Sequence, residues 1–190
     1  MSIKNYGVNI HSQNFEDGIL QECMKRLKIK NGHVIEAGAH NGFYCSNTRL
    51  LIEQGFTATL VEADEELFKQ IPDEPNVMSF NEFVTPENVN EIFPQKAVLA
   101  SLDFDGTDYL IWKAYTGKPD IVIIEINSSL DPNEDYFTKD EGANFSIMNK
   151  LAKSKGYFLL CHTGNCVYIL NKHLPLFPDR SDEFNTSWLK

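Results

Sequence analysis

The sequence predicts an α/β domain built on a mostly parallel β-sheet, and three observations lead to this prediction. Short apolar strands alternate with helical segments through five repeats. The first of these strands ends in a loop that contains two glycines, Gly38 and Gly42. The last two strands are joined by a short turn at residues 163–166. Strand–helix alternation requires parallel strands covered by helices on both faces, and a closing hairpin adds one antiparallel strand at an edge.

The first predicted helix spans residues 12–29. Ile19, Cys23 and Leu27 share one helical face, acidic residues lie near its start, and basic residues lie near its end, which suits the helix dipole. The strands that follow are expected at residues 33–37, 57–62, 76–80, 97–102, 121–126, 157–162 and 167–170. The intervening helices are expected at residues 43–54, 64–71, 86–93, 107–115 and 145–155, and residues 127–140 are expected to form a polar loop.

This order of elements is typical of one fold class. Five βα units that close with a hairpin form the Rossmann-like, three-layer sandwich of class I S-adenosylmethionine (SAM)-dependent methyltransferases, with a seven-stranded, mostly parallel sheet. Nicotinamide dehydrogenases are a less favoured alternative, because their sheets are usually all parallel and their glycine loop is G-x-G-x-x-G, whereas this loop is G-x-x-x-G.

Length and charge limit the organisation and the partners. The chain has 190 residues, of which 42% are hydrophobic, and this predicts one domain over residues 1–190, with an N-terminal arm (1–11) and a C-terminal tail (172–190). A net charge of −10 argues against nucleic acid and anionic membranes as partners. The N-terminus lacks the apolar core of a signal peptide, and no apolar run approaches bilayer length, so a cytoplasmic location is expected.

The first two strands carry a predicted cofactor site. In such sheets a ligand binds beyond the carboxyl ends of the strands, so Gly38 would allow a tight turn against it and Gly42 would allow the next helix to begin close by. Glu62, followed by Ala63, ends the second strand, where an acid can accept both ribose hydroxyls of SAM. The alternative for Glu62 is a solvated acid before a helix that Asp64 caps.

Four other residues complete the predicted SAM site. Glu36 is a carboxylate inside a strand, and it either faces the amino end of the methionine moiety or hydrogen-bonds to the neighbouring loop. Asn81 and Glu82 follow the third strand, where they can meet the adenine. His40 stands where many methyltransferases have a small residue, so it either crowds SAM or reaches the substrate.

A second polar constellation follows the fourth and fifth strands. Asp103 and Asp105 share one strand face, as do Glu125 and Asn127, and buried acids at adjacent strand ends invite a proton, a cation or a substrate hydroxyl. The alternative is that Asp105 and Asp108 only cap the following helix. Asp103 is also counted among the candidate cofactor-binding residues.

Several segments resemble one family. They are SQNFEDGIL, VIEAGAHNGFYCSNTRLL, VEAD, NEFVTPENVNEIF, SLDFDGTDYLIWKA, VIIEINSSLDP and GYFLLCHTGNCVYIL, in order over residues 12–170. Together they resemble a bacterial and phage group of FkbM-like SAM methyltransferase-fold proteins. The resemblance implies O-methylation of a sugar or another small molecule, SAM binding by Glu36, Gly38 and Glu62, and a methyl-transfer face at Asp103 and Asp105.

The expected mechanism is in-line transfer of a methyl group to a hydroxyl whose proton passes to Asp103 or Asp105, aided by Glu125 and Asn127. A Mg²⁺-assisted variant would use the same four residues as ligands, as in catechol O-methyltransferase. The rival hypothesis is a SAM-fold binding or regulatory protein without methyl transfer. No Asn-Pro-Pro-Tyr-like tetrapeptide follows the fourth strand, so amino methylation of nucleobases or glutamine is disfavoured.

Other conspicuous residues have structural interpretations. Cys161 and Cys166 flank a hairpin turn and lack a second ligand pair, and four scattered cysteines do not predict a disulfide framework. Trp112 is expected in the core. The arm with Tyr6 and His11 is expected to be flexible, although an arm there could cover the pocket. Trp188 is expected to anchor the tail.

Overall fold

The computed structural model describes residues 2–184 and contains a seven-stranded sheet in the order β3-β2-β1-β4-β5-β9-β8. Its strands are β1 (His33–Ala37), β2 (Thr57–Glu62), β3 (Val77–Asn81), β4 (Leu99–Leu102), β5 (Ile121–Ile124), β8 (Tyr157–His162) and β9 (Cys166–Leu170). The first five strands are parallel, and β9 pairs antiparallel with both β5 and β8. The predicted fold class is confirmed. The antiparallel strand lies one position inside the edge, because β8 itself forms the edge.

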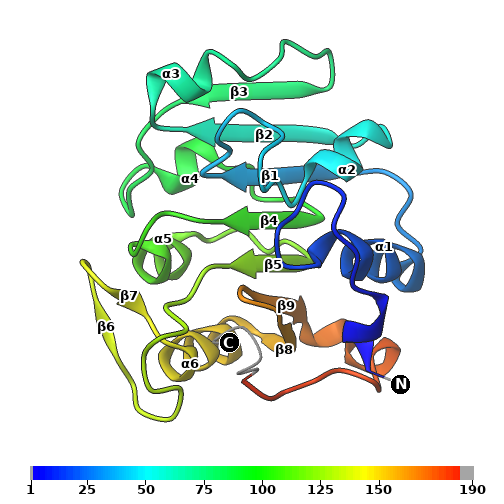
Figure 1. Ribbon diagram of the computed structural model, residues 1–190, viewed down its shortest axis with the longest axis vertical. Helices are drawn as coiled ribbons and strands as arrows, with labels where there is room; N and C mark the ends of the chain where they lie inside the picture. The colour runs from blue at the N-terminus through cyan, green and yellow to red at the C-terminus, as the bar shows by residue number, and fades with distance from the viewer. Residues whose placement is uncertain (1, 185–190) are drawn as a thin grey trace.

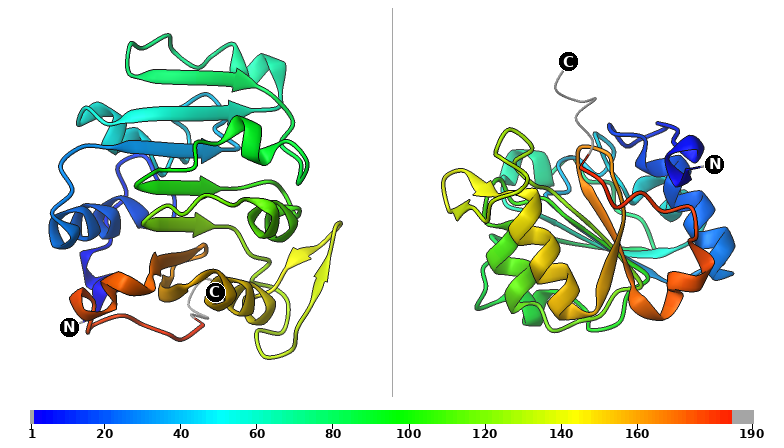
Figure 2. Two further views of the ribbon diagram at one scale, coloured as in Figure 1. Left: turned by 180° about the vertical axis from the view of Figure 1, so that it is seen from behind. Right: turned by 90° about the horizontal axis from the view of Figure 1, so that it is seen from below.

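Helices cover both faces of this sheet. They are α1 (Glu16–Leu27), α2 (Arg49–Glu53), α3 (Glu65–Phe68), α4 (Val89–Ile92), α5 (Asp108–Ala114) and α6 (Phe145–Lys155). Figure 1 shows the arrowheads of β1 to β5 at one edge of the molecule, and Figure 2 shows α5 and α6 on the face opposite to α1. These are the three layers that strand–helix alternation predicts.

The sheet separates two hydrophobic cores because alternate residues of each strand point to opposite faces. Val34, Leu99 and Ile121 pack with the helices α1 and α2. Ile35 and Val122, one position along their strands, pack with α4, α5 and α6 instead. Trp112 of α5 is fully buried in this second core, as predicted.

The second predicted helix is much shorter than expected. Residues 43–48 form a loop, and α2 begins only at Arg49. The carboxylate of Glu36 accepts hydrogen bonds from Ser46 Oγ (2.5 Å), Asn47 N (2.6 Å) and Thr48 Oγ1 (2.7 Å). These contacts hold the chain close to β1, and Cys45 has a left-handed backbone (φ 55°) that a helix does not contain. A buried acceptor therefore competes with the helix for this segment.

The predicted polar loop at residues 127–140 contains ordered structure. Two short strands, β6 (Phe137–Thr138) and β7 (Gly142–Ala143), form an antiparallel hairpin outside the main sheet. Gly142 lies against Gly106 in the loop after β4; a Cβ atom at Gly142 would be 3.3 Å from the Gly106 Cα atom. Two glycines thus let the hairpin pack directly on that loop.

The N-terminal arm is held in place rather than flexible. Asp17 of α1 accepts hydrogen bonds at Oδ2 from the backbone N–H groups of Ile10, His11 and Ser12, at 2.7–2.8 Å. The arm also contains a 3-10 helix (Ile3–Tyr6) whose Ile3 is fully buried. The prediction of a flexible arm was wrong because one buried carboxylate satisfies three successive donors.

The C-terminal tail begins with a second 3-10 helix (Asn171–Leu176), and Trp188 lies outside the described residues. All four cysteines are free. Within residues 2–184, no helix combines the length and the apolar character that crossing a bilayer requires.

Candidate functional site

Two cavities lie at the carboxyl ends of the parallel strands. We call the first the cofactor cleft; it lies beyond β1, β2, β3 and β4, and its lining is Gly38, Val61, Glu62, Ala63, Glu82, Phe83, Val84, Asp103, Phe104, Asp105 and Thr107. We call the second the acidic cavity; it lies beyond β4 and β5 under the β6–β7 hairpin, and its lining is Asp105, Gly106, Asp108, Glu125, Ile126, Asn127, Ser128, Asp140, Glu141, Gly142 and Ala143. Asp105 contributes to both.

Gly38 forms the floor of the cofactor cleft. Its φ is 73°, and a Cβ atom there would lie 2.4 Å from the backbone oxygen of Asp103. The residue must therefore be glycine for the loop after β1 to pass the end of β4. Gly42 also has a positive φ (81°), but it packs toward Ile71 and Pro72 and does not line the cleft.

Glu62 connects the two loops that border the cleft. Its Oε2 atom accepts the backbone N–H of His40 (2.7 Å), and its Oε1 atom accepts that of Asp64 (2.9 Å). Each carboxylate oxygen can accept a further hydrogen bond, so the side chain still has capacity for ligand hydroxyls on its cleft side. Asp64 also caps α3 through Glu66 N and Leu67 N. The predicted cap by Asp64 is confirmed, whereas contact between Glu62 and a ribose stays a prediction.

His40 contacts the Glu62 carboxylate through its backbone N–H. Its side chain is absent from the described lining of the cleft, and its ring packs against Tyr44 with 5.1 Å between ring centroids. The crowding of the pocket that the sequence suggested is not seen in this structure. A direct contact between His40 and the cofactor or substrate stays a prediction.

Of the two roles predicted for Glu36, the structure shows hydrogen bonding to the neighbouring loop. It is 3% exposed, and the three donors described above surround its carboxylate. Burial raises the pKa of Glu36, and the hydrogen bonds from Ser46 and Thr48 oppose that rise. Glu36 therefore organises the loop that leads into α2, and its contact with a cofactor stays a prediction.

The third strand contributes an apolar wall that sequence reasoning missed. Asn81 donates to the carbonyl oxygens of Glu62 (2.8 Å) and Ala63 (3.1 Å), so it braces β2 and does not line the cleft, whereas Ala63 and Glu82 do line it. Phe83 and Val84 follow directly. Two apolar residues at the second and third positions after β3, where the chain should stay polar, were the available signal.

The cleft is narrow, with a volume of about 110 Å³. Small-molecule sites usually measure roughly 300 Å³ or more. The Phe83 side chain at its rim is 69% exposed, so it is free of the packing that would prevent it from moving.

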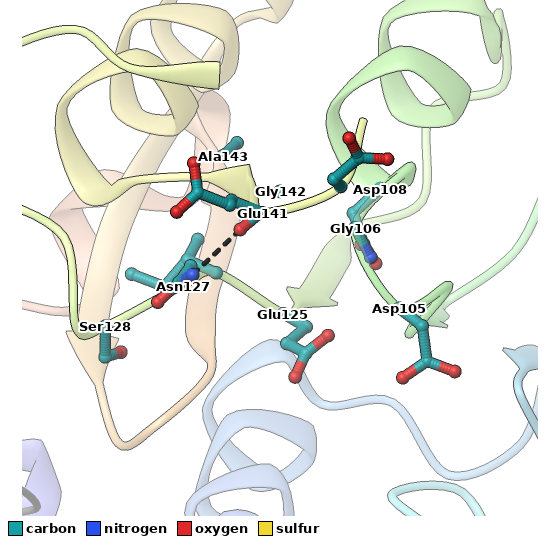
Figure 3. Close-up of a pocket in the computed structure, with 11 residues that line it drawn as sticks. Asp105, Gly106, Asp108, Glu125, Asn127, Ser128, Glu141, Gly142 and Ala143 are labelled. Carbon is teal, nitrogen blue, oxygen red and sulfur yellow. Dashed lines mark hydrogen bonds between the residues drawn. The ribbon is translucent and has the colours of Figure 1, made fainter. Parts of the chain in front are cut away.

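Three predicted acids meet between the two cavities. Carboxylate oxygens of Asp103, Asp105 and Glu125 lie within 4.8 Å of one another. We call these residues the carboxylate cluster. Figure 3 shows Glu125 and Asp105 with their carboxylates directed toward the same region below the hairpin. The β4 and β5 strands end at Leu102 and Ile124, so the loops after them, and not strand alternation, bring the acids together.

Electrostatic repulsion perturbs this cluster. Burial and the neighbouring Asp103 carboxylate raise the pKa of Glu125 to about 8. Burial and Asp105 likewise raise the pKa of Asp103, while hydrogen bonds from Glu125 and from the Asp105 backbone oppose the rise. The loss of hydration and the like charges therefore favour one proton shared between Glu125 and Asp103 over two ionised carboxylates.

Asp108 shapes the loop that presents the cluster. It is 3% exposed and accepts hydrogen bonds from the backbone N–H groups of Phe104 (2.9 Å) and Gly106 (3.1 Å). Burial raises its pKa to about 7. The predicted capping of α5 by Asp108 is not seen, because Asp108 is the first residue of the helix and these hydrogen bonds come from the preceding loop. Asp105 is exposed at a left-handed position (φ 50°) and is not the cap of α5, which follows Thr107.

Asn127 serves the hairpin rather than the cluster. Its Nδ2 donates to the Glu141 carbonyl oxygen (2.8 Å), its backbone N–H donates to Ala143 O (2.9 Å), and its Oδ1 accepts from Ser129 N (3.0 Å) and Ser129 Oγ (2.5 Å). The first of these bonds is drawn in Figure 3. Asn127 lines the acidic cavity, but its side-chain amide is hydrogen-bonded to Ser129 and to the β6–β7 hairpin, which forms the roof of this cavity. Its catalytic and metal-ligand roles therefore stay predictions.

Known structures share this architecture at low sequence identity. A Staphylococcus aureus protein provisionally named a caffeoyl-CoA O-methyltransferase is 17% identical over 85% of this chain and 84% of that chain, with a TM-score of 0.57. A Lactococcus lactis protein provisionally named a hemolysin is 16% identical over 79% and 84%, with a TM-score of 0.53. A Pyrococcus horikoshii protein provisionally named an RNA methyltransferase is 13% identical over 81% and 82%, with a TM-score of 0.52.

These similarities and the strand order define the fold of class I SAM-dependent methyltransferases. No protein-family model matches the sequence, and no curated protein sequence matches it.

Proposed function

We propose that the protein is a SAM-dependent methyltransferase that methylates a hydroxyl group of a small polar molecule. The observation that carries this proposal is that Asp105 lines both cavities, within a carboxylate cluster that spans them. A methyl donor in the cofactor cleft and an acceptor in the acidic cavity would meet at these carboxylates. The similarity to methyltransferase structures supports the fold on which the proposal rests.

The residues of the cofactor cleft suit SAM. The Glu62 carboxylate lies at the end of β2, where it would accept ribose hydroxyls, and Gly38 leaves room beside the end of β1. Phe83, Val84 and Phe104 would provide an apolar surface for adenine. When bound, SAM supplies an electrophilic methyl group on its sulfonium. Glu62 and the glycine loop would orient it toward the carboxylate cluster.

The chemistry asked of the protein is modest. The acceptor oxygen attacks the methyl carbon, a C–O bond forms as the C–S bond breaks, and the sulfur keeps the electron pair and becomes a neutral thioether. The hydroxyl proton passes to a carboxylate, for which exposed Asp105 and its neighbour Asp103 are placed. Glu125 would hold the shared proton that keeps the cluster from carrying three full charges.

A Mg²⁺-assisted variant is the second candidate, and the spacing of the cluster favours it. Asp103, Asp105 and Glu125 offer three oxygen ligands, the type that Mg²⁺ prefers, and a cation would relieve their mutual repulsion. The bound ion would lower the pKa of the acceptor hydroxyl. Asn127 completes this set only if its amide leaves the hairpin.

Membership of the FkbM-like group, a sugar or other small-molecule acceptor, and the exclusion of nucleic acid belong to this proposal. The resemblance of the segments around Glu36, Asp103 and Glu125 supports the first. The acidic lining of the second cavity and the net charge of −10 support the others.

Calorimetric titration with SAM and S-adenosylhomocysteine, with and without Mg²⁺, tests the proposal. We expect micromolar binding by the wild type and a loss of about tenfold or more in Glu62→Gln, because the amide offers one fewer acceptor. Glu66→Gln, at an exposed acid of α3, is the matched control.

No binding by the folded wild type would overturn the methyltransferase proposal. Tight binding without transfer to any hydroxyl would favour the alternative of a regulatory SAM-fold protein. An affinity or a rate that requires Mg²⁺ would select the metal-assisted variant.

A further inference from the structure

The acidic cavity differs in charge from an ordinary sugar or nucleotide pocket. It has a volume of about 480 Å³, which is enough for a monosaccharide-sized molecule. Five of the eleven described lining residues are acids, and none of the eleven is Lys, Arg or His; the acids are Asp105, Asp108, Glu125, Asp140 and Glu141. Figure 3 labels four of these acids, which come from three segments: the loop after β4 with the start of α5 (Asp105, Asp108), the end of β5 (Glu125), and the hairpin (Glu141). Asp140 directly precedes Glu141 in the sequence.

Only some of these carboxylates accept hydrogen bonds from other protein groups. Asp108 accepts two backbone N–H groups, and Glu141 is hydrogen-bonded to the Tyr136 hydroxyl. Asp105 and Asp140 are exposed, and Glu125 is in contact with another carboxylate, Asp103. The cavity therefore presents negative charge from both its floor and its roof to whatever enters it.

This distribution has opposite consequences for cationic and anionic ligands. Anions such as phosphate esters would face like charges without a counter-charge among the described lining residues, and this costs affinity. A protonated amine would gain charge-assisted hydrogen bonds to carboxylates.

We propose that the acceptor carries a protonated amine beside the hydroxyl that is methylated, as an amino sugar or a cyclic amino alcohol does, and that phosphorylated or CoA-linked acceptors are rejected. The amine would bind among Asp105, Glu125 and Asp140. An amine held as a cation has no free lone pair, so the oxygen and not the nitrogen is methylated. The identity of the reaction rests on the function proposed above, whereas the charge preference is a property of the cavity itself.

Three sugars that differ in charge test the preference: glucosamine, glucose and glucose 6-phosphate. Each is titrated by calorimetry into the full-length protein at pH 7, with EDTA to remove metals, and both with and without S-adenosylhomocysteine. We expect glucosamine to bind at least about tenfold more tightly than glucose, and glucose 6-phosphate to bind more weakly than glucose. Raising the salt concentration should narrow these differences.

Asp140→Asn removes one exposed carboxylate from the roof and should reduce the preference for glucosamine over glucose by about threefold. Asp73→Asn removes the same charge from an exposed position before β3, away from the cavity, and should leave the preference unchanged. Equal effects of the two variants would assign the preference to overall charge and would overturn the proposal.

The two proposals fail separately. Glucose 6-phosphate that binds as tightly as glucosamine, or no binding of any of the three sugars at millimolar concentration, overturns the amine inference even if S-adenosylhomocysteine binds. Preference for glucosamine in a protein that does not bind S-adenosylhomocysteine leaves the charge preference standing and overturns only the methyltransferase proposal. Binding of glucosamine only when Mg²⁺ replaces EDTA also contradicts the inference, because the cluster would then be a metal site.

Discussion

Two sets of carboxylates lie at the carboxyl ends of the parallel strands, and they differ in the groups that surround them. Glu36 and Glu62, at β1 and β2, accept hydrogen bonds from backbone N–H and hydroxyl groups of the adjoining loops. Asp103, Asp105 and Glu125, at β4 and β5, lie mainly against one another. An acid that receives donors from its own chain organises the fold, whereas acids that repel one another keep affinity for a ligand proton or cation.

The largest effect expected from this difference is on turnover. Asp105→Asn should lower methyl transfer by at least about a hundredfold, because the amide cannot accept the hydroxyl proton. The affinity for SAM should change by less than about threefold, since Glu62 and the apolar wall remain. Formation of S-adenosylhomocysteine with glucosamine as acceptor, or with a better amino alcohol from a screen, measures the rate. A parallel loss of SAM affinity would mean that Asp105 holds the cofactor instead.

A substitution at Glu36 tests the first set of carboxylates, Glu36 and Glu62. Glu36→Ala should lower the free energy of unfolding by about 2–4 kcal/mol, because three buried donors lose their acceptor. Urea unfolding followed by circular dichroism measures this. Asp105→Asn is the matched control and should change stability by less than about 0.5 kcal/mol, since its side chain is exposed and Asn tolerates the left-handed backbone at this position. Similar losses in both variants would remove the distinction between the two sets.

The apolar wall can be examined in the same way. Phe83→Ala should weaken SAM binding by about tenfold, because stacking of a base on an aromatic ring contributes on the order of 1–3 kcal/mol. Tyr44→Ala removes an aromatic ring of similar exposure, 66% against 69% for Phe83, from a loop that does not line the cleft. Calorimetry with S-adenosylhomocysteine distinguishes the variants. An equal effect of the two would argue against stacking on Phe83.

The smallest expected effect is a pH dependence of stability. The pKa of Glu125 is raised from 4.5 to about 8 in the folded protein, so the folded state binds more protons than the unfolded state between these values. Its contribution to stability is therefore fully present below pH 4.5 and is lost as the pH rises through 8. Glu125→Gln should remove this part of the slope and be the more stable protein at pH 9, by on the order of 1 kcal/mol.

Urea unfolding at pH 5, 7 and 9 measures the difference. Glu91→Gln, at an exposed acid of α4, is the control. If the difference between Glu125→Gln and the wild type is the same at all three pH values, Glu125 is not the protonated member of the cluster.

The sequence by itself determined the order of strands and helices. This order determines the layers and the end of the parallel strands at which a ligand would bind. Period-2 and period-3.6 patterns are local, and the rule that crossovers are right-handed leaves few ways to arrange five βα units. The same rules place Glu62, Asp103, Asp105 and Glu125 at the carboxyl ends of the strands, because parallel strands have their carboxyl ends on the same side of the sheet. These parts of the fold and site were predictable without coordinates.

Only the tertiary structure decided which polar groups find partners. The loss of the helix at residues 43–48 depends on Glu36, more than ten positions away from Asn47. The hairpin over the acidic cavity depends on Asn127 and on a contact between Gly106 and Gly142. Strands of two residues carry no periodicity, and a carboxylate in a sequence does not show its donors. The free energy of a buried acid is set by neighbours that only the folded chain brings together.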